Sequence, residues 1–192
     1  MTERLTAQDW IDFALTTLAR QGFGALKADV LARQLGISRG SFYWHFTDLA
    51  RFHTLVIEHW KQKATEAIIT DIERYTAPEE RLDALLGHAF GHGGSLEIRM
   101  RTWAENNGEA ARAVGDIDRR RREYIKQLLV QAGVAPTLAE TRAQLLYWTY
   151  LGAALSRGRL SGRRLDRMVG ELKQVALGAL PGKLPLHAET SS

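Results

Sequence analysis

The chain has 192 residues, of which 45% are hydrophobic, and its formal net charge at pH 7 is +4. This apolar content is sufficient for a folded core and excludes a chain that is disordered throughout. The chain has no cysteine, which excludes disulfide scaffolds, thiolate zinc sites and cysteine nucleophiles. It has no signal-peptide pattern and no apolar run long enough to cross a bilayer, so we expect a cytoplasmic protein without a membrane partner.

Apolar residues at helical spacing predict three short helices in the N-terminal quarter of the chain. Thr6 with Asp9 has the capping-box pattern that opens the first helix. The second helix is expected to begin near Lys27, and Gly36 can adopt the left-handed conformation that ends it. Ser38 is a favourable N-cap for the third helix.

Six further helices are expected after this segment. Thr47 and Asp48 are N-cap candidates for a long helix that reaches about Tyr75. Thr137 with Glu140 has the capping-box pattern again, near the start of the eighth helix. The five helices after the long one are expected at about 76–91, 95–105, 109–133, 137–155 and 161–176.

These elements predict an all-α fold of about nine helices without a sheet. We expect an N-terminal helix-turn-helix domain at residues 1–47 and a C-terminal helical bundle at residues 48–180. Residues 181–192, with two prolines followed by polar residues, are expected to form a flexible tail. No flexible linker separates the first two parts, so we expect them to be mechanically joined.

The predicted third helix has one apolar face and one polar, aromatic face. Phe42 and Phe46 are four residues apart, so they share the inward face. The outward face carries Arg39, Gly40, Tyr43 and Trp44, with Ser41 and His45 at its flanks. Such a face suits a DNA groove, because arginine reaches guanine or phosphate, glycine permits close approach, and the hydroxyl and imidazole groups donate hydrogen bonds. Packing of these aromatic side chains against neighbouring helices is the alternative.

The segment at residues 22–46 reads Gly-Phe-(x)7-Leu-Ala-x-x-Leu-Gly-Ile-Ser-Arg-Gly-Ser-Phe-Tyr-Trp-His-Phe. It resembles the DNA-binding signature of the TetR family of bacterial transcriptional regulators, and the length and helix count extend the resemblance to the whole chain. The resemblance implies a homodimer that binds a double-stranded DNA operator and a C-terminal domain that binds a small-molecule effector. No cofactor is expected. It implies DNA contacts at Ser38, Arg39, Gly40, Ser41, Tyr43, Trp44 and His45.

Two positions depart from the family pattern. The family usually has threonine or serine at the start of the second helix, where this chain has Leu26 and Lys27. Lys27 can still reach a phosphate as a point charge. The family also usually has lysine at the position of Leu49. We therefore expect DNA binding with fewer phosphate contacts and a shallower salt dependence than usual.

The family layout places the effector cavity within the C-terminal helices. Residues with an apolar body and a polar or polarisable group suit such a cavity, although ordinary core packing is an equal alternative for each. The effector candidates are Trp60, His88, Met100, Trp103, Tyr124, Tyr147 and Trp148. The last two helices of each subunit would form the dimer interface, with candidates Leu145, Trp148, Gly152, Leu155, Leu165, Met168, Leu172 and Val175.

Charged and histidine-rich segments allow further interpretations. The run Arg119–Arg122 is interpreted as a solvated surface, partly paired with Asp116, Asp118 and Glu123, and an anionic effector or second DNA contact is the alternative. The arginines at positions 157, 159, 163 and 164 surround the turn between the eighth and ninth expected helices. They are interpreted as a solubilising rim beside the dimer interface.

His88 and His92 are four residues apart but have no third ligand of suitable spacing, so no metal site is predicted.

The sequence has no recognisable catalytic constellation, and we do not expect an enzyme. The preferred function is a ligand-responsive, TetR-like regulator of transcription, most often a repressor. A helical adaptor for other proteins, with weakened or lost DNA binding, is the first alternative. An enzyme with its site in the helical bundle is the second, and the missing catalytic residues argue against it.

Overall fold

The computed structural model describes residues 5–91, 94–156 and 161–178. Across these ranges the fold is all-α, without a strand, as the sequence predicts. The tail predicted at residues 181–192 lies outside them. The elements are α1 (Ala7–Gln21), the 3-10 turn η1 (Phe23–Ala25), α2 (Ala28–Leu35), α3 (Arg39–His45), α4 (Leu49–Lys61), the π-helical turn η2 (Gln62–Glu66), α5 (Ala67–Ile72), α6 (Pro78–Gly91), α7 (Ser95–Ala104), α8 (Gly108–Gln131), α9 (Pro136–Leu155) and α10 (Gly162–Leu177).

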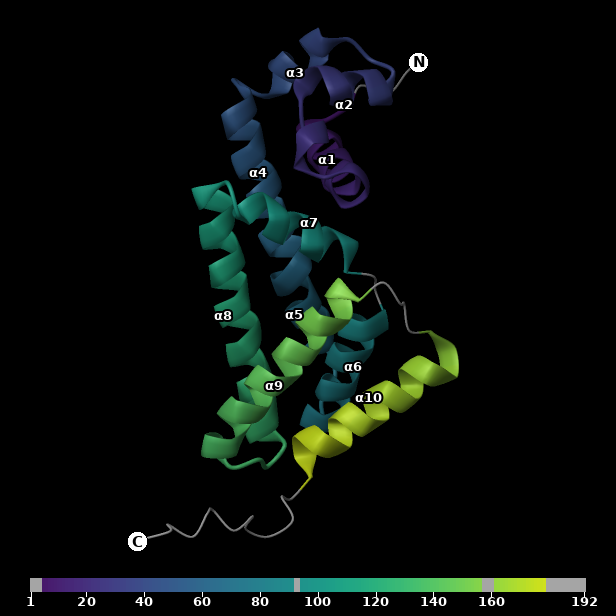
Figure 1. Cartoon of the computed structure of the whole chain (residues 1–192), viewed down its shortest axis with the longest axis vertical. Coiled ribbons are helices and arrows are strands. Elements are labelled where there is room, and N and C mark those ends of the chain that lie inside the picture. The colour runs from purple at the N-terminus through teal and green to yellow at the C-terminus, as the bar shows by residue number, and fades with distance from the viewer. Residues whose placement is uncertain (1–4, 92–93, 157–160, 179–192) are drawn as a thin grey trace, which may run out of the picture.

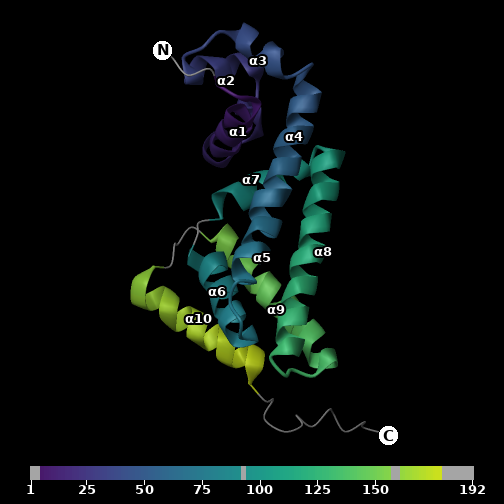
Figure 2. The same ribbon diagram turned by 180° about the vertical axis from the view of Figure 1, so that it is seen from behind.

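The three N-terminal helices gather at one end of the molecule, and the C-terminal helices form a bundle at the other end (Figure 1). The segment α4–η2–α5 is one continuous helix that runs from the N-terminal end into the bundle beside α8 (Figure 2). Counted as one, it brings the described chain to nine helices. The long helix predicted after Asp48 is therefore confirmed, although the sequence did not indicate its π-helical turn.

Local signals explain where several helices begin and end. The amide of Asp9 donates to the Thr6 hydroxyl at 3.2 Å, and the amide of Thr6 donates to the Asp9 carboxylate at 2.7 Å. This reciprocal pair is the predicted capping box. Asp48 caps α4 through one hydrogen bond, since its carboxylate accepts from the amide of Arg51 at 2.7 Å.

The tight turn between α2 and α3 depends on Gly36. Its φ of +70° lies in the left-handed region, as predicted, and this conformation favours glycine because it has no Cβ. The turn is closed by the amide of Ile37, which donates to the Ala32 carbonyl at 3.0 Å. The turn sets α3 against α2 in a helix-turn-helix arrangement.

Ser95 and Thr137, the residues expected as N-caps of two helices, instead lie within the first turn of those helices. Thr137 lies inside α9, whose N-cap is Ala135 and whose first residue is Pro136. Proline suits this position because its fixed φ is helical and the first turn does not use its missing N–H. Ser95 is the first residue of α7 and its N-cap is Gly94.

The core of the N-terminal helices continues into the bundle. Trp10 of α1, Phe42 of α3 and Phe52 of α4 are fully buried in one cluster that also contains Met100 and Trp103 of α7. A second cluster joins α6, α8, α9 and α10. The first cluster crosses the expected boundary near residue 47, so the two parts share buried surface as well as a helix.

Candidate functional site

Helix α3 is held by aromatic packing on its inner face. The Phe42 ring lies edge-on to Trp10 of α1 at 5.4 Å between centroids and to Phe52 of α4 at 5.0 Å. Phe46 packs on Phe52 at 4.8 Å. Edge-to-face contacts of this kind favour a defined ring geometry, so α3 has a fixed orientation relative to α1 and α4. The predicted inward face is confirmed by the burial of both phenylalanines.

The opposite face of α3 is open. Tyr43 and Trp44 are among the exposed large aromatic residues, with 46% and 71% of their surfaces accessible. The Arg39 guanidinium donates to the Tyr43 hydroxyl at 3.0 Å, so these two side chains form one polar unit on the helix surface. Ser38 and Gly40 are exposed beside Arg39, whereas Ser41 and His45 are half-buried.

Lys27 lies apart from this helix, at the N-cap of α2. Its side chain is exposed and makes no capping hydrogen bond within the described ranges. The structure therefore gathers seven of the eight predicted DNA contacts on α3 and its N-cap, and places the eighth on the neighbouring helix.

The bundle encloses a cavity of about 780 Å³. Most of its wall is apolar, and α5 and α6 contribute Ile69, Leu86 and Phe90 to it. Helix α1 of the N-terminal domain forms another part of the wall, through Leu15 and Ala19 among others. A volume of this size suits a drug-sized organic molecule.

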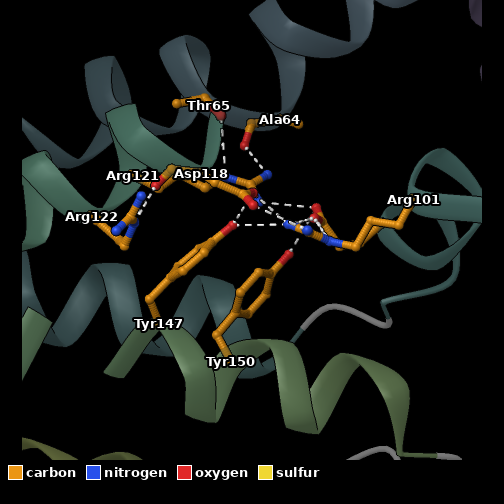
Figure 3. Close-up of polar contacts among 9 residues, drawn as sticks. Ala64, Thr65, Arg101, Asp118, Arg121, Arg122, Tyr147 and Tyr150 are labelled. Carbon is orange, nitrogen blue, oxygen red and sulfur yellow. Dashed lines mark hydrogen bonds and ion pairs between the residues drawn. The ribbon is translucent and has the colours of Figure 1, made fainter. Parts of the chain in front are cut away.

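A polar network lies at one side of the cavity (Figure 3). Arg121 of α8 donates to the Glu97 carboxylate at 2.9 Å, to the Thr65 hydroxyl at 3.2 Å and to the Ala64 carbonyl at 2.9 Å. The side chain of Glu97 is only 6% exposed. A buried carboxylate requires a charged partner and hydrogen bonds, and Arg121 supplies both.

The network continues to the neighbouring helices. Arg101 of α7 forms a two-pronged contact with Asp118, at 2.5 and 3.1 Å, and also donates to Glu97 at 2.8 Å. Tyr147 of α9 donates to Asp118 at 2.6 Å, and Tyr150 donates to Glu97 at 3.3 Å. These contacts tie α7, α8 and α9 together around the cavity (Figure 3).

The network keeps its tyrosines neutral and its arginines charged. Burial and the hydrogen bond to Asp118 raise the pKa of Tyr147 above the ordinary tyrosine value. Burial and the charge of Glu97 raise the pKa of Tyr150 to about 12. Burial alone would lower the pKa of Arg121, but the Glu97 charge raises it above the ordinary arginine value. At neutral pH, two arginine charges therefore face two carboxylate charges.

Tyr124 of α8 also lines the cavity. Its side chain is buried, and within the part of the chain that the structure describes its hydroxyl makes no hydrogen bond. Burial raises the pKa of this hydroxyl, so it is a neutral hydrogen-bonding group at neutral pH. Among the described residues it is one of three buried side-chain polar atoms without a protein partner, together with Nε1 of Trp10 and Nε1 of Trp103.

Helix α1 is joined to the long helix by a small polar cluster. Asp12 of α1 accepts from His59 of α4 at 2.9 Å and from Lys63 of η2. The side-chain amide of Gln8 lies 3.0 Å from the same imidazole nitrogen of His59. Asp12 and Lys63 also line the cavity, so this joint and the cavity wall share residues.

Metal binding and membrane insertion have no support among the described residues. No group of three or more His, Asp or Glu side chains there is arranged to hold a metal ion. His92, one of the two histidines considered from the sequence, lies outside those residues. No described helix is both long and apolar enough to cross a membrane.

Comparison with known proteins identifies the N-terminal domain. Residues 11–48, which contain α2 and α3, match the family model described as bacterial regulatory proteins, tetR family. The helix-turn-helix segment of this chain is therefore of the TetR-family type. No curated protein matches it in sequence.

Solved structures share the fold over most of the chain. A transcriptional regulator from Rhodococcus sp. Rha1 is 18% identical, with a TM-score of 0.74 over 90% of this chain and 96% of that chain. The fatty acid degradation regulator FadR from Bacillus halodurans is 16% identical, with a TM-score of 0.64 over 91% and 96%. AibR, solved with isovaleryl coenzyme A and operator DNA, is 13% identical, with a TM-score of 0.65 over 88% and 96%.

The residues expected to bind the effector fall in two groups. Trp60, His88, Tyr124 and Tyr147 line the cavity. The other three lie elsewhere. Met100 is fully buried in the core shared with α1, and Trp103 stacks on Phe23 at 4.5 Å. Trp148 is 61% exposed on the outer side of α9.

Sequence reasoning missed Arg121, Glu97 and Tyr150 as cavity residues. The interpretation of the arginine run as solvated surface fits Arg119, which is 71% exposed and pairs with Asp116. It is wrong for Arg121, whose side chain is 15% exposed. The missed signal is helical phase: Arg121 lies four residues after Ile117 and four before Ile125, and both are buried.

The residues expected at the dimer interface lie on α9 and α10. Five of them are exposed large hydrophobic residues, namely Leu145, Trp148, Leu155, Met168 and Val175. Gly152 is exposed, while Leu165 and Leu172 are half-buried against the second core cluster. The arginines at positions 163 and 164 are exposed at the start of α10, and those at 157 and 159 lie outside the described residues.

Proposed function

We propose that this chain is a ligand-responsive transcriptional repressor that binds operator DNA as a homodimer in the cytoplasm. The observation that carries the proposal is the double role of α1. One part of α1 forms a wall of the cavity through Leu15 and Ala19, and Trp10 of the same helix packs on Phe42 of α3. A molecule in the cavity would therefore touch the element that supports the DNA-binding helix.

The exposed face of α3 is the proposed DNA contact. Its N-terminus offers backbone N–H groups to a phosphate, and the Arg39–Tyr43 unit can read a base edge or hold a phosphate. Two such helices, one from each subunit, would enter successive major grooves about 34–36 Å apart. The proposed contacts are Lys27, Ser38, Arg39, Gly40, Ser41, Tyr43, Trp44 and His45.

Effector binding is proposed to act through α1 and the long helix. The ligand changes DNA affinity only if it binds the DNA-competent and DNA-released forms with different affinity. A ligand against Leu15 and Trp60 would press on α1 and α4 together, and both helices pack directly on α3. AibR, which has the same fold, was solved with a small ligand and operator DNA, and this precedent supports the combination.

The homodimer is proposed to form through α9 and α10. Leu145, Trp148 and Leu155 recur at intervals of three and seven residues, so they share one face of α9. All three are at least half exposed in the isolated chain. Large apolar side chains gathered on one surface favour burial against a partner.

The test is operator binding by the wild-type protein and two tyrosine variants. Fluorescence anisotropy with DNA from upstream of the chain's own gene should show binding. Tyr43→Ala should weaken it about tenfold or more, because a base or phosphate contact is lost. Tyr75→Ala, at an exposed tyrosine beyond α5, should bind as the wild type does. A wild-type protein that binds neither this DNA nor any sequence selected from a random pool would contradict the proposal and favour the helical adaptor.

A further inference from the structure

The long helix is irregular where it passes the cavity. In the π-helical turn η2, the amide of Ala67 donates to the carbonyl of Gln62, which lies five residues earlier rather than four. Such turns are rare and interrupt the regular pairing of main-chain groups, so neighbouring side chains can take over part of that pairing. The turn lies between α4, which packs on α3, and α5, which lines the cavity.

Arg121 of α8 binds the inner side of this turn (Figure 3). Its guanidinium donates to the main-chain carbonyl of Ala64 at 2.9 Å and to the hydroxyl of Thr65 at 3.2 Å. A third hydrogen bond, of 2.9 Å, joins it to the carboxylate of Glu97 on α7. A planar guanidinium holds its donors in fixed directions, so the three bonds together fix the position of the turn relative to α7 and α8.

Thr65 lacks the hydrogen bond that other helical threonines of this chain make. A threonine hydroxyl within a helix can donate to the carbonyl four residues earlier. Four of them do so here, namely Thr16, Thr54, Thr70 and Thr149. Thr65 is only 3% exposed, and among the described residues its hydroxyl is bonded to Arg121 alone. The geometry of the turn therefore depends on an arginine of another helix.

Two ion pairs hold the turn from other sides. Lys63 contacts Asp12 of α1, and Glu66 pairs with Arg120 of α8 at 3.2 Å. Both members of the second pair are more than 40% exposed and lie outside the cavity wall, and an exposed pair contributes little to stability. Arg121, by contrast, is 15% exposed and is part of that wall. A molecule in the cavity would therefore reach the turn through Arg121.

We propose that Arg121 is the positioning residue that couples the cavity to the DNA-binding helices. Its hydrogen bonds to η2 fix the junction between α4 and α5, and α4 supports α3 through Phe52. A ligand group that accepts hydrogen bonds from Arg121 would take them from Ala64 and Thr65, and the direction of α4 would no longer be fixed. The effect on DNA rests on the proposed function, whereas the role of Arg121 in the turn does not.

The alternative is that Arg121 only neutralises the buried Glu97. The Glu97 side chain is 6% exposed, and a buried carboxylate that loses its cation is strongly unfavourable. Replacement of both residues by methionine removes this requirement, because apolar side chains then occupy the place of the ion pair. Arg101 stays paired with Asp118 in that variant. The double variant therefore separates the neutralisation of Glu97 from the positioning of the turn.

The first test measures amide hydrogen exchange of residues 62–72 in the full chain. The double variant Glu97→Met/Arg121→Met should exchange there about tenfold or more faster than the wild type, because the turn has lost its side-chain donors. Arg121→Lys should also exchange faster, since lysine keeps the charge beside Glu97 but lacks the planar fork. Arg120→Met, at the neighbouring arginine of the same helix, is the matched control and should exchange as the wild type does.

Urea unfolding shows whether each variant is folded. Wild-type exchange in a folded double variant would show that Arg121 only neutralises Glu97, and would overturn the proposal. If the double variant does not fold, Arg121→Lys decides in the same way.

The second test measures operator binding by fluorescence anisotropy, with DNA from upstream of the chain's own gene and no ligand present. Both Arg121 variants should bind about fivefold or more weakly than the wild type, because loss of the guanidinium reproduces the release of the turn. Arg120→Met should bind as the wild type does. Fast exchange with unchanged operator affinity would overturn the coupling. A wild-type protein that bound no DNA would contradict the proposed function, and the exchange result would still decide whether Arg121 holds the turn.

Discussion

The carboxylate of Asp12 on α1 lies 2.9 Å from the imidazole of His59 on α4. Lys63 contacts the same carboxylate oxygen from η2. Three side chains thereby hold the first helix against the long helix, at the edge of the cavity. A ligand that displaced any of them would change the position of α1 relative to α4, and both of these helices pack on α3.

Asp12→Asn should destabilise the protein in a pH-dependent way. Burial raises the pKa of Asp12, but the hydrogen bonds from Lys63, His59 and Gln8 lower it well below the ordinary value. The ionised form therefore stabilises the fold at neutral pH, and this contribution is lost as the pH falls below about 4. Because Asp12 is 40% exposed, we expect only about 0.5–1 kcal/mol at pH 7.

The measurement is urea unfolding of both proteins between pH 7 and pH 3. Asp71→Asn is the control, since Asp71 pairs with Arg74 on the surface and is 67% exposed. That variant should match the wild type throughout. A difference between wild type and Asp12→Asn that stayed constant down to pH 3 would show that ionisation of Asp12 is not its source.

Gly94→Ala should destabilise the junction between α7 and α9. A Cβ at Gly94 would lie 2.5 Å from the Ala154 Cβ and 2.6 Å from its Cα, and neither atom is the end of a flexible side chain that could move aside. Overpacking of this kind costs about 1–3 kcal/mol. Thermal or urea unfolding measures the loss.

Gly87→Ala on α6 is the matched control for Gly94. A Cβ there meets nothing within 4 Å, so the substitution should stabilise the helix by about 0.5–1 kcal/mol. The two identical substitutions should therefore have opposite signs. Equal effects at both positions would mean that α7 and α9 do not approach each other as closely as described.

Leu49→Lys should strengthen operator binding at low salt. Leu49 is the first residue of α4 and is only partly buried, so a lysine there can extend into solvent toward a phosphate. Each added phosphate contact steepens the slope of log affinity against log salt by about 0.9. Anisotropy titrations at several salt concentrations measure this slope, and Leu49→Gln controls for the lost leucine. Equal slopes for the lysine and glutamine variants would exclude a phosphate near position 49.

Trp148→Glu should convert the proposed dimer to a monomer. A charge would replace a large apolar side chain at the centre of the exposed face of α9, and burying that charge without a partner is unfavourable. Light scattering after gel filtration measures the mass. Val130→Glu, at an exposed apolar residue of α8, should stay dimeric. A dimeric Trp148→Glu variant would place the interface elsewhere.

Much of the fold could be predicted from the sequence because its signals are local. The capping box at Thr6, the left-handed glycine at Gly36 and the paired phenylalanines of α3 each depend on residues a few positions apart. The first residue of a helix was harder to predict, because neighbouring residues can each suit the first turn. The sequence offered two possible starts for α9, at Thr137 and at Pro136. The helix begins at Pro136.

The cavity could be predicted only in part, because its wall combines elements that are far apart in the chain. The sequence pointed to the C-terminal helices, whereas Leu15 and Ala19 of α1 are also part of the wall. No local pattern of α1 distinguishes a residue that faces a cavity from one that faces a packed core. The same holds for Trp103, an expected ligand residue that stacks on Phe23.

The π-helical turn η2 gives the long helix an extra residue at the level of the cavity. Trp60 before it, Thr65 within it and Ile69 after it all line the cavity, at intervals of five and four residues. Successive residues of a regular α-helix are rotated by about 100°, which would place Ile69 roughly half a turn away from Trp60. Deletion of one residue from this turn would therefore change every cavity-facing position of α5 at once. An insertion of this kind gives a lineage a way to acquire a new effector while the sequence of the DNA-binding helix stays the same.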